Sequence, residues 1–121
     1  MTSVLGVTLT VDVSAQTDQG GVHDFMTYCA VCHGSDARGK GPMASKLTNQ
    51  PPDLTRLREK NNGVFPQDLV YQLLDGRRLV IFHGTREMPI WGDRFTLEDQ
   101  ETTAKDRISA LVNYLKEIQV E

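Results

Sequence analysis

The chain has 121 residues, of which 24% are charged and 39% hydrophobic, with a formal net charge of -3 at pH 7. This length predicts one folded domain, and the slightly acidic balance argues against a nucleic-acid partner. Two cysteines rule out a disulfide scaffold, and no apolar run approaches the ~18 residues of a membrane span.

The N-terminal segment has some features of a secretory signal peptide. A modestly apolar run over residues 4–11 precedes the small residues of positions 13–15, a pattern typical of a cleavage site. A complete signal also needs a positively charged start, but the first basic residue is Arg38. We therefore expect residues 1–18 to be either a signal-peptide remnant or a flexible lead-in, and residues 19–121 to form the domain.

Helical periodicity begins near Gly21 and runs into the cysteines. Apolar side chains recur there at spacings of three and four, and Gly34 is placed to end this helix in a left-handed conformation. A second helix is expected over residues 53–60, between two prolines and a stretch of Asn and Gly. A third is expected from Gln67 to Asp75, since Pro66 precedes it and Gly76 follows it.

The C-terminal segment has the clearest amphipathic pattern, formed by Ile108, Leu111, Val112, Leu115 and Ile118. Strand patterns are nearly absent, because Leu79 to Phe82 is the one short apolar run of that type and a single run cannot form a sheet. The sequence therefore predicts an all-α domain.

The motif that carries chemistry is Cys29-Ala30-Val31-Cys32-His33, the attachment pattern of a c-type haem. On a helix, positions i and i+3 direct both sulfur atoms to one side, where they can form thioethers with the two vinyl groups of a porphyrin. His33 would then be the proximal ligand of the iron. The alternatives are a thioredoxin-like redox pair, half of a zinc site or a structural disulfide. The adjacent histidine favours the haem.

A six-coordinate haem iron needs a second axial ligand, and Met88 is the leading candidate. It follows His33 by fifty-five residues, enough chain to wrap around a haem, and Pro89 stiffens the backbone after it. His83 is the rival ligand. Core packing is the ordinary role of a methionine, and a structural role is the ordinary one for a histidine beside an apolar run.

From Gln19 to Val120 the chain resembles the small bacterial class I cytochromes c. Gly21 and Phe25 stand eight and four residues before Cys29, where that family has the glycine and aromatic residue of its first helix. Tyr114 and Leu115 match their C-terminal counterparts. Further similar segments are the loop after His33, the run Pro51-Pro52-Asp53-Leu54 and the run Met88-Pro89-Ile90-Trp91-Gly92.

The resemblance implies a cytochrome c fold, with three to five helices packed around one covalently bound haem. It implies that a carbonyl at Pro42 accepts a hydrogen bond from the proximal histidine. It also implies that Trp91, and either Arg77 or Arg78, lie near the haem propionates.

The function that follows is one-electron transfer between redox protein partners, without catalysis of a substrate reaction. A haem-based gas sensor or peroxidase-like protein is the alternative if the sixth position is open, and a distal His or Arg would favour it. A disulfide oxidoreductase is a third class. Because haem c is normally attached outside the cytoplasm, we expect a periplasmic location.

The charge along the chain suggests how a partner is recognised. Residues 38–94 carry a local charge of +4, whereas the flanking parts are acidic. The loops expected to frame the haem edge lie in this basic block, so it could steer an acidic partner. The charges nearest those loops in sequence are Lys40, Lys46, Arg86 and Arg94.

Overall fold

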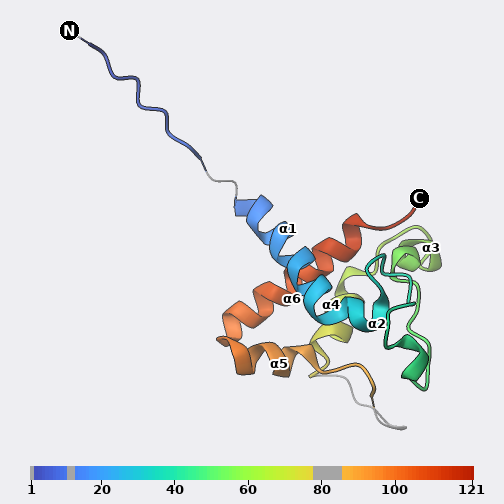
Figure 1. The fold of residues 1–121 in the computed structure, drawn as a ribbon. Coiled ribbons are helices and arrows are strands. Elements are labelled where there is room, and N and C mark those ends of the chain that lie inside the picture. Colours follow the sequence, from blue (N-terminus) through green and yellow to red (C-terminus); the bar gives the residue numbers. More distant parts are fainter. Residues whose placement is uncertain (1, 11–12, 78–85) are drawn as a thin grey trace.

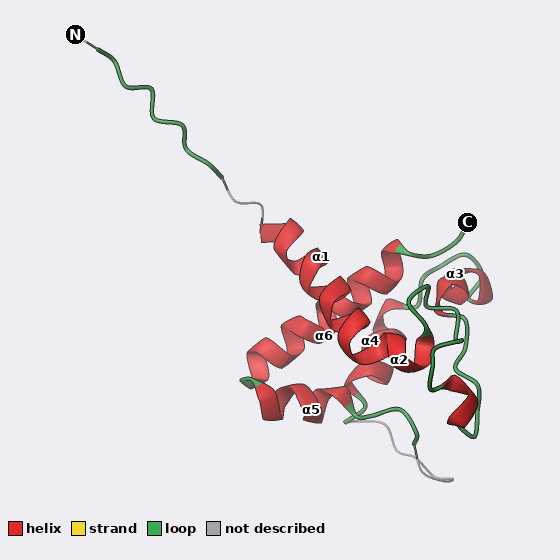
Figure 2. Ribbon diagram, in the orientation of Figure 1, coloured by secondary structure: helices red, strands yellow, loops and turns green. Residues whose placement is uncertain are grey.

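The computed structural model describes residues 2–10, 13–77 and 86–121, and these ranges contain helices and loops but no strand (Figures 1 and 2). The prediction of an all-α protein is therefore confirmed for the described residues. Within the same ranges, no helix is both long enough and apolar enough to cross a membrane. In chain order the elements are α1 (Val13–Asp24), η1 (Phe25–Cys29), α2 (Ala30–His33), η2 (Ala44–Lys46), η3 (Leu54–Arg56), α3 (Leu57–Lys60), α4 (Gln67–Asp75), α5 (Trp91–Glu98) and α6 (Glu101–Glu117).

The first three elements form one continuous helical segment that ends at the cysteine motif. Its middle part, η1, is π-helical, and the amide of Ala30 donates to the carbonyl of Phe25, five residues earlier. Such widened turns are uncommon and occur often at functional sites. Gly34 ends the segment as predicted and has a positive φ of 83°, but its ψ of 153° is extended rather than the left-handed helical conformation that was expected. Helix α1 begins at Val13, so the backbone of residues 13–18, within the expected lead-in, is helical.

Helix α1 crosses α6, and the two form the main pair of the fold (Figure 1). The crossing is close because Gly21 lacks a side chain: a Cβ there would overlap the carbonyl oxygen of Ala110. One turn further on, the rings of Phe25 and Tyr114 lie with their centroids 5.2 Å apart. The sequence prediction that these residues join the first and last helices is confirmed.

The core forms where α4, α5 and α6 pack around this crossing. Its largest fully buried side chains are Phe25, Phe95, Ile108, Leu111 and Val112. Ile108, Leu111 and Val112 lie on the predicted apolar face of α6, so the amphipathic pattern predicted for this helix is confirmed. Removing such side chains from water is the main favourable contribution to folding.

The shorter helices follow their predicted boundaries. Asp53 accepts a hydrogen bond from the amide of Thr55 at 2.9 Å and so caps the start of η3, which continues into α3 as far as Lys60. Helix α4 spans Gln67–Asp75 as predicted, and Gly76 follows it with φ 71°. The run Leu79 to Phe82 lies outside the described residues.

Residues 2–10 extend away from the helical body in Figure 1. Their apolar side chains contact nothing that buries them, and Val4, Leu5, Val7 and Leu9 are each at least 84% exposed. This segment therefore adds nothing to the core.

Candidate functional site

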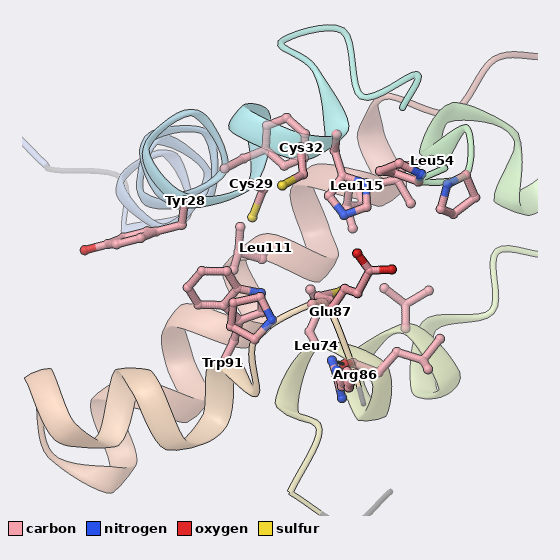
Figure 3. A pocket seen from close by; sticks show the side chains of 18 of the residues that line it. Tyr28, Cys29, Cys32, Leu54, Leu74, Arg86, Glu87, Trp91, Leu111 and Leu115 are labelled. Atoms are coloured by element: carbon pink, nitrogen blue, oxygen red, sulfur yellow. Dashed lines mark hydrogen bonds between the residues drawn. The ribbon is translucent and has the colours of Figure 1, made fainter. Parts of the chain in front are cut away.

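A cavity of about 600 Å³ opens between the cysteine motif, α4, the start of α5 and α6 (Figure 3). This volume is within the ~300–1,000 Å³ typical of small-molecule and cofactor sites. Most of its wall is apolar, and Leu54, Leu57, Val70, Leu73, Leu74, Leu111 and Leu115 line it together with two prolines at positions 51 and 52. An apolar wall of this size excludes water and favours a large apolar ligand.

Both cysteines line the cavity, and in Figure 3 their sulfur atoms point into it. Cys29 is buried and Cys32 partly exposed, and both are free thiols. Burial raises the pKa of the Cys29 thiol to about 12, with smaller contributions from the negative charges of Asp24 and Cys32. The helical spacing presents the two sulfur atoms to one side, as the sequence predicts.

The loop after His33 folds back onto the end of the helical segment. Amides of Gly39, Gly41 and Met43 donate to carbonyl oxygens of His33, Cys32 and Val31, at 2.7, 3.1 and 2.8 Å. These bonds satisfy carbonyls that a helix end leaves without partners. The loop thus fixes the backbone on which Cys32 and His33 sit.

His33 lines the cavity, and its Nδ1 is buried without a hydrogen-bond partner among the described residues. The bond to a carbonyl at Pro42, implied by the resemblance, is therefore not formed. Pro42 is exposed and does not line the cavity. The physical reason is that this loop packs through its backbone amides, which bring N–H donors rather than a carbonyl acceptor toward the helix end. Burial also lowers the pKa of His33, so the neutral imidazole is favoured.

Met88 and Trp91 reach the same cavity from the segment that leads into α5. Met88 is partly buried against the core. Trp91 is buried at the first position of α5 and packs against Tyr28 and Phe95, with ring centroids 5.6 Å from each. Its indole Nε1 is buried and has no partner among the described residues. The structure thus brings Met88 and Trp91 together with Cys29, Cys32 and His33.

The rival axial ligand, His83, lies outside the described residues, as does Arg78. Arg77 is described, and it does not line the cavity. Its guanidinium instead forms salt bridges with Asp75 at 2.8 Å and Glu101 at 2.9 Å. These two carboxylates raise the pKa of Arg77 and occupy its donors, so the implied role of Arg77 at a propionate is not supported.

Arg86 and Glu87 are site residues that the sequence reasoning missed or placed elsewhere. Both line the cavity, and Figure 3 shows them across from the two sulfur atoms. Arg86 was expected among surface charges, but its Nη1 is buried without a partner in the described residues, while Nη2 donates to the Leu73 carbonyl. In the sequence, the feature that points to these residues is that they are the two residues before Met88.

Protein-family models, curated proteins and solved structures contain no match to this chain. What the site can hold follows from its own residues. The cavity combines two thiols on one helix face, a neutral imidazole and a thioether within an apolar wall. Three buried nitrogen atoms that have no partner among the described residues, His33 Nδ1, Arg86 Nη1 and Trp91 Nε1, belong to residues that line it. This set fits a large, flat, mostly apolar group with a metal centre and anionic substituents, and haem has that composition.

Proposed function

We propose that the protein is an electron carrier with a single c-type haem, attached through Cys29 and Cys32. The observation that carries the proposal is that all four predicted haem ligands and anchors, the two thiols, His33 and Met88, line one apolar cavity. A haem bound there would supply an iron that gains and loses a single electron.

The cysteines would hold the haem covalently. In that addition each thiol forms a bond from sulfur to one carbon of a vinyl group, and its hydrogen goes to the other carbon, so no external oxidant is needed. The anchored group cannot leave by simple dissociation. Its attachment directly beside His33 favours imidazole coordination on one face of the iron.

The remaining cavity residues would orient the haem and tune it. Met88 would supply the thioether ligand, which favours ferrous iron and raises the reduction potential. Arg86 Nη1 and Trp91 Nε1 are buried donors without a partner among the described residues, and they would suit the haem carboxylates. Since a guanidinium and a carboxylate form charge-assisted hydrogen bonds, Arg86 would contribute most to this orientation.

A haem-based sensor or peroxidase-like protein is the second candidate, and the presence of Arg86 in the cavity is the observation that favours it. Such proteins need an open position on the iron. Met88 in the same cavity supports a closed, six-coordinate iron instead, and Arg86 is already bonded to the carbonyl of Leu73 at the end of α4. Electron transfer without ligand exchange is therefore the proposal that fits more of the site.

A disulfide oxidoreductase fits less well. Catalysis of thiol–disulfide exchange requires a thiolate, and enzymes of that kind lower the pKa of the attacking cysteine. The Cys29 pKa is raised to about 12 by burial, which disfavours the thiolate.

The proposal includes redox protein partners as electron donor and acceptor, and a periplasmic location, because haem c attachment normally takes place outside the cytoplasm. The exposed Lys40 and Lys46, on the loop after His33, support an acidic docking surface on the partner.

The test is to produce the full chain with a haem c maturation system and to measure its mass under denaturing conditions. We expect the mass of the chain plus one haem, and a visible spectrum with the thioether-to-iron band. Met88→Ala should abolish that band and open the iron to carbon monoxide. Met43→Ala is the matched control, because Met43 is 40% exposed and does not line the cavity. Unmodified thiols in the matured protein would refute the proposal, and carbon monoxide binding by the wild-type protein would favour the sensor.

A further inference from the structure

Glu87 stands immediately before Met88 and bonds to a distant part of the chain. Its Oε2 accepts a hydrogen bond from the amide of Thr48 at 2.9 Å, and its Oε1 accepts one from the amide of Asn49 at 3.2 Å. One carboxylate therefore binds two consecutive backbone N–H groups. Hydrogen bonds to an ionised acceptor are shorter and stronger than those between neutral groups.

These bonds join two walls of the cavity. The loop of residues 47–52 contributes Leu47, Asn49, Gln50 and the two prolines to the lining, and the segment of residues 86–91 contributes Arg86 to Pro89 and Trp91. The Glu87 carboxylate links these two walls, and Figure 3 shows it directed across the cavity rather than toward α5.

The neighbouring residue ties the same segment to another element. Arg86 Nη2 donates to the carbonyl of Leu73, in the last turn of α4. Residues 86–89 themselves form no backbone–backbone hydrogen bond with any other described residue. The hydrogen bonds that hold this segment thus come from the side chains of the two residues before Met88, and they add to the packing of Met88 against the core.

We propose that Glu87 is a positioning residue for Met88: its carboxylate, held by the amides of Thr48 and Asn49, keeps the thioether directed at the haem iron. The inference rests on the proposed function, since it assigns how the sixth ligand of that site is held. Without the carboxylate, the segment carrying Met88 keeps the Arg86 bond and the packing of Met88 against the core but loses its link to residues 48 and 49, so the thioether leaves the iron more often.

Three variants of the full, haem-loaded chain test this. Glu87→Ala removes both acceptors, and Glu87→Gln keeps the shape but presents an amide to two N–H donors. Thr48→Pro leaves Glu87 intact and removes one donor. Leu47 has φ -86° and ψ 149°, the extended backbone that a following proline favours. Glu117→Ala, on the exposed part of α6, is the control.

The measurements are the intensity of the thioether-to-iron band, the reduction potential and the rate of carbon monoxide binding to the ferrous protein. We expect Glu87→Ala to weaken the band, lower the potential and raise the rate at least tenfold, which corresponds to about 1.4 kcal/mol. Glu87→Gln and Thr48→Pro should raise the rate of carbon monoxide binding by a smaller factor, and Glu117→Ala should leave that rate unchanged.

The two proposals fail in different ways. If the wild-type protein lacks the thioether-to-iron band, Met88 is not a ligand and the proposed function fails at that point. If the wild-type band is present but Glu87→Gln and Thr48→Pro both bind carbon monoxide at the wild-type rate, the positioning role is wrong. Glu87→Gln and Thr48→Pro therefore test the positioning role of Glu87 even if Glu87→Ala matures poorly.

Discussion

Gly21 in α1 lies against the carbonyl of Ala110 in α6, so closely that a Cβ at position 21 would overlap that oxygen. The neighbour is backbone, which cannot move aside as a flexible side chain can. Gly21→Ala should therefore separate the two helices and destabilise the protein by about 1–3 kcal/mol, the usual cost of overpacking. Urea unfolding of the protein measures this loss.

Gly20→Ala is the matched control. Gly20 is the preceding residue of the same helix, and a Cβ there would meet nothing within 4 Å. Replacing an exposed helical glycine by alanine should stabilise by about 0.5–1 kcal/mol. Opposite signs for the two neighbours are expected, and equal effects would contradict the close crossing.

Apolar spacing in the sequence predicts α6, and the resemblance to the class I cytochromes c implies that the glycine and phenylalanine before Cys29 lie where the first helix crosses the last. Helix α5 was not predicted, since Trp91–Glu98 has glycine and aspartate in its first turn and few apolar residues to set a period. Its stability comes from packing of Trp91 and Phe95 against other elements, which a local pattern does not reveal.

Some site residues can likewise be predicted from the sequence, whereas others become apparent only in the folded chain. Cys29, Cys32, His33 and Met88 are identified by a motif and by chain length. The arginine that reaches the cavity is Arg86, whereas Arg77 is bonded to Asp75 and Glu101. Both residues look alike in sequence, and the choice between them depends on carboxylates that only the folded chain brings near. The Glu87 bonds to Thr48 and Asn49 likewise join residues nearly forty positions apart.

Gly41 should be needed for the geometry of the attachment loop. A Cβ there would lie 2.5 Å from the carbonyl oxygens of Ala30 and Val31, inside van der Waals contact. We expect Gly41→Ala to push the loop off the helix end, to cost about 1–3 kcal/mol and to perturb the haem spectrum through His33. Unfolding and visible spectroscopy test both effects.

Gly63→Ala separates steric overlap from backbone strain. Gly63 has φ 83°, but a Cβ there would meet open space. Its replacement should cost about 1–2 kcal/mol through the left-handed backbone alone and leave the haem spectrum unchanged. A spectral change in Gly63→Ala, or none in Gly41→Ala, would contradict the role given to the loop.

Arg107 joins three helices. Its guanidinium lies 3.0 Å from Asp24 at the end of α1 and 3.1 and 2.8 Å from Glu98 and Asp99 at the end of α5, and it stacks 3.8 Å from the centroid of Phe95. Arg107→Met keeps most of the side-chain length but leaves Asp24 without this partner. We expect a loss near the lower end of the ~3–5 kcal/mol seen when one member of a buried pair is removed. Lys105→Met, an exposed site on the same helix, should change stability by less than ~0.5 kcal/mol.

The same cluster predicts an acid dependence of stability. Hydrogen bonds from Arg94, and then from Arg107, lower the pKa of Glu98 in the folded protein. A lowered folded pKa stabilises above the unfolded value of about 4.3, and that contribution is lost as the pH falls through the folded pKa. The free energy of unfolding should therefore decrease below about pH 4, and Arg107→Met should make this decrease shallower. A slope unchanged by the substitution would show that the Glu98 pairing does not contribute.

Partner recognition is the last prediction, and the structure narrows the charges that can carry it. Arg86 lines the cavity and Arg94 pairs with Glu98 at 3.0 Å, so neither is a free surface charge. Lys40 and Lys46 are exposed on the loop between His33 and the cavity residue Leu47.

If Lys40 and Lys46 steer an acidic partner, the second-order rate of electron transfer should fall as salt is added, because the Debye length shortens from ~10 Å at 0.1 M to ~8 Å at 0.15 M. The double variant Lys40→Glu and Lys46→Glu should lower the rate at low salt and flatten its salt dependence, whereas the same change at Lys116, on α6, should have little effect. Stopped-flow kinetics with small acidic and basic redox proteins would measure this, and a rate with the acidic protein that rises with salt would mean that the docking surface has the opposite sign.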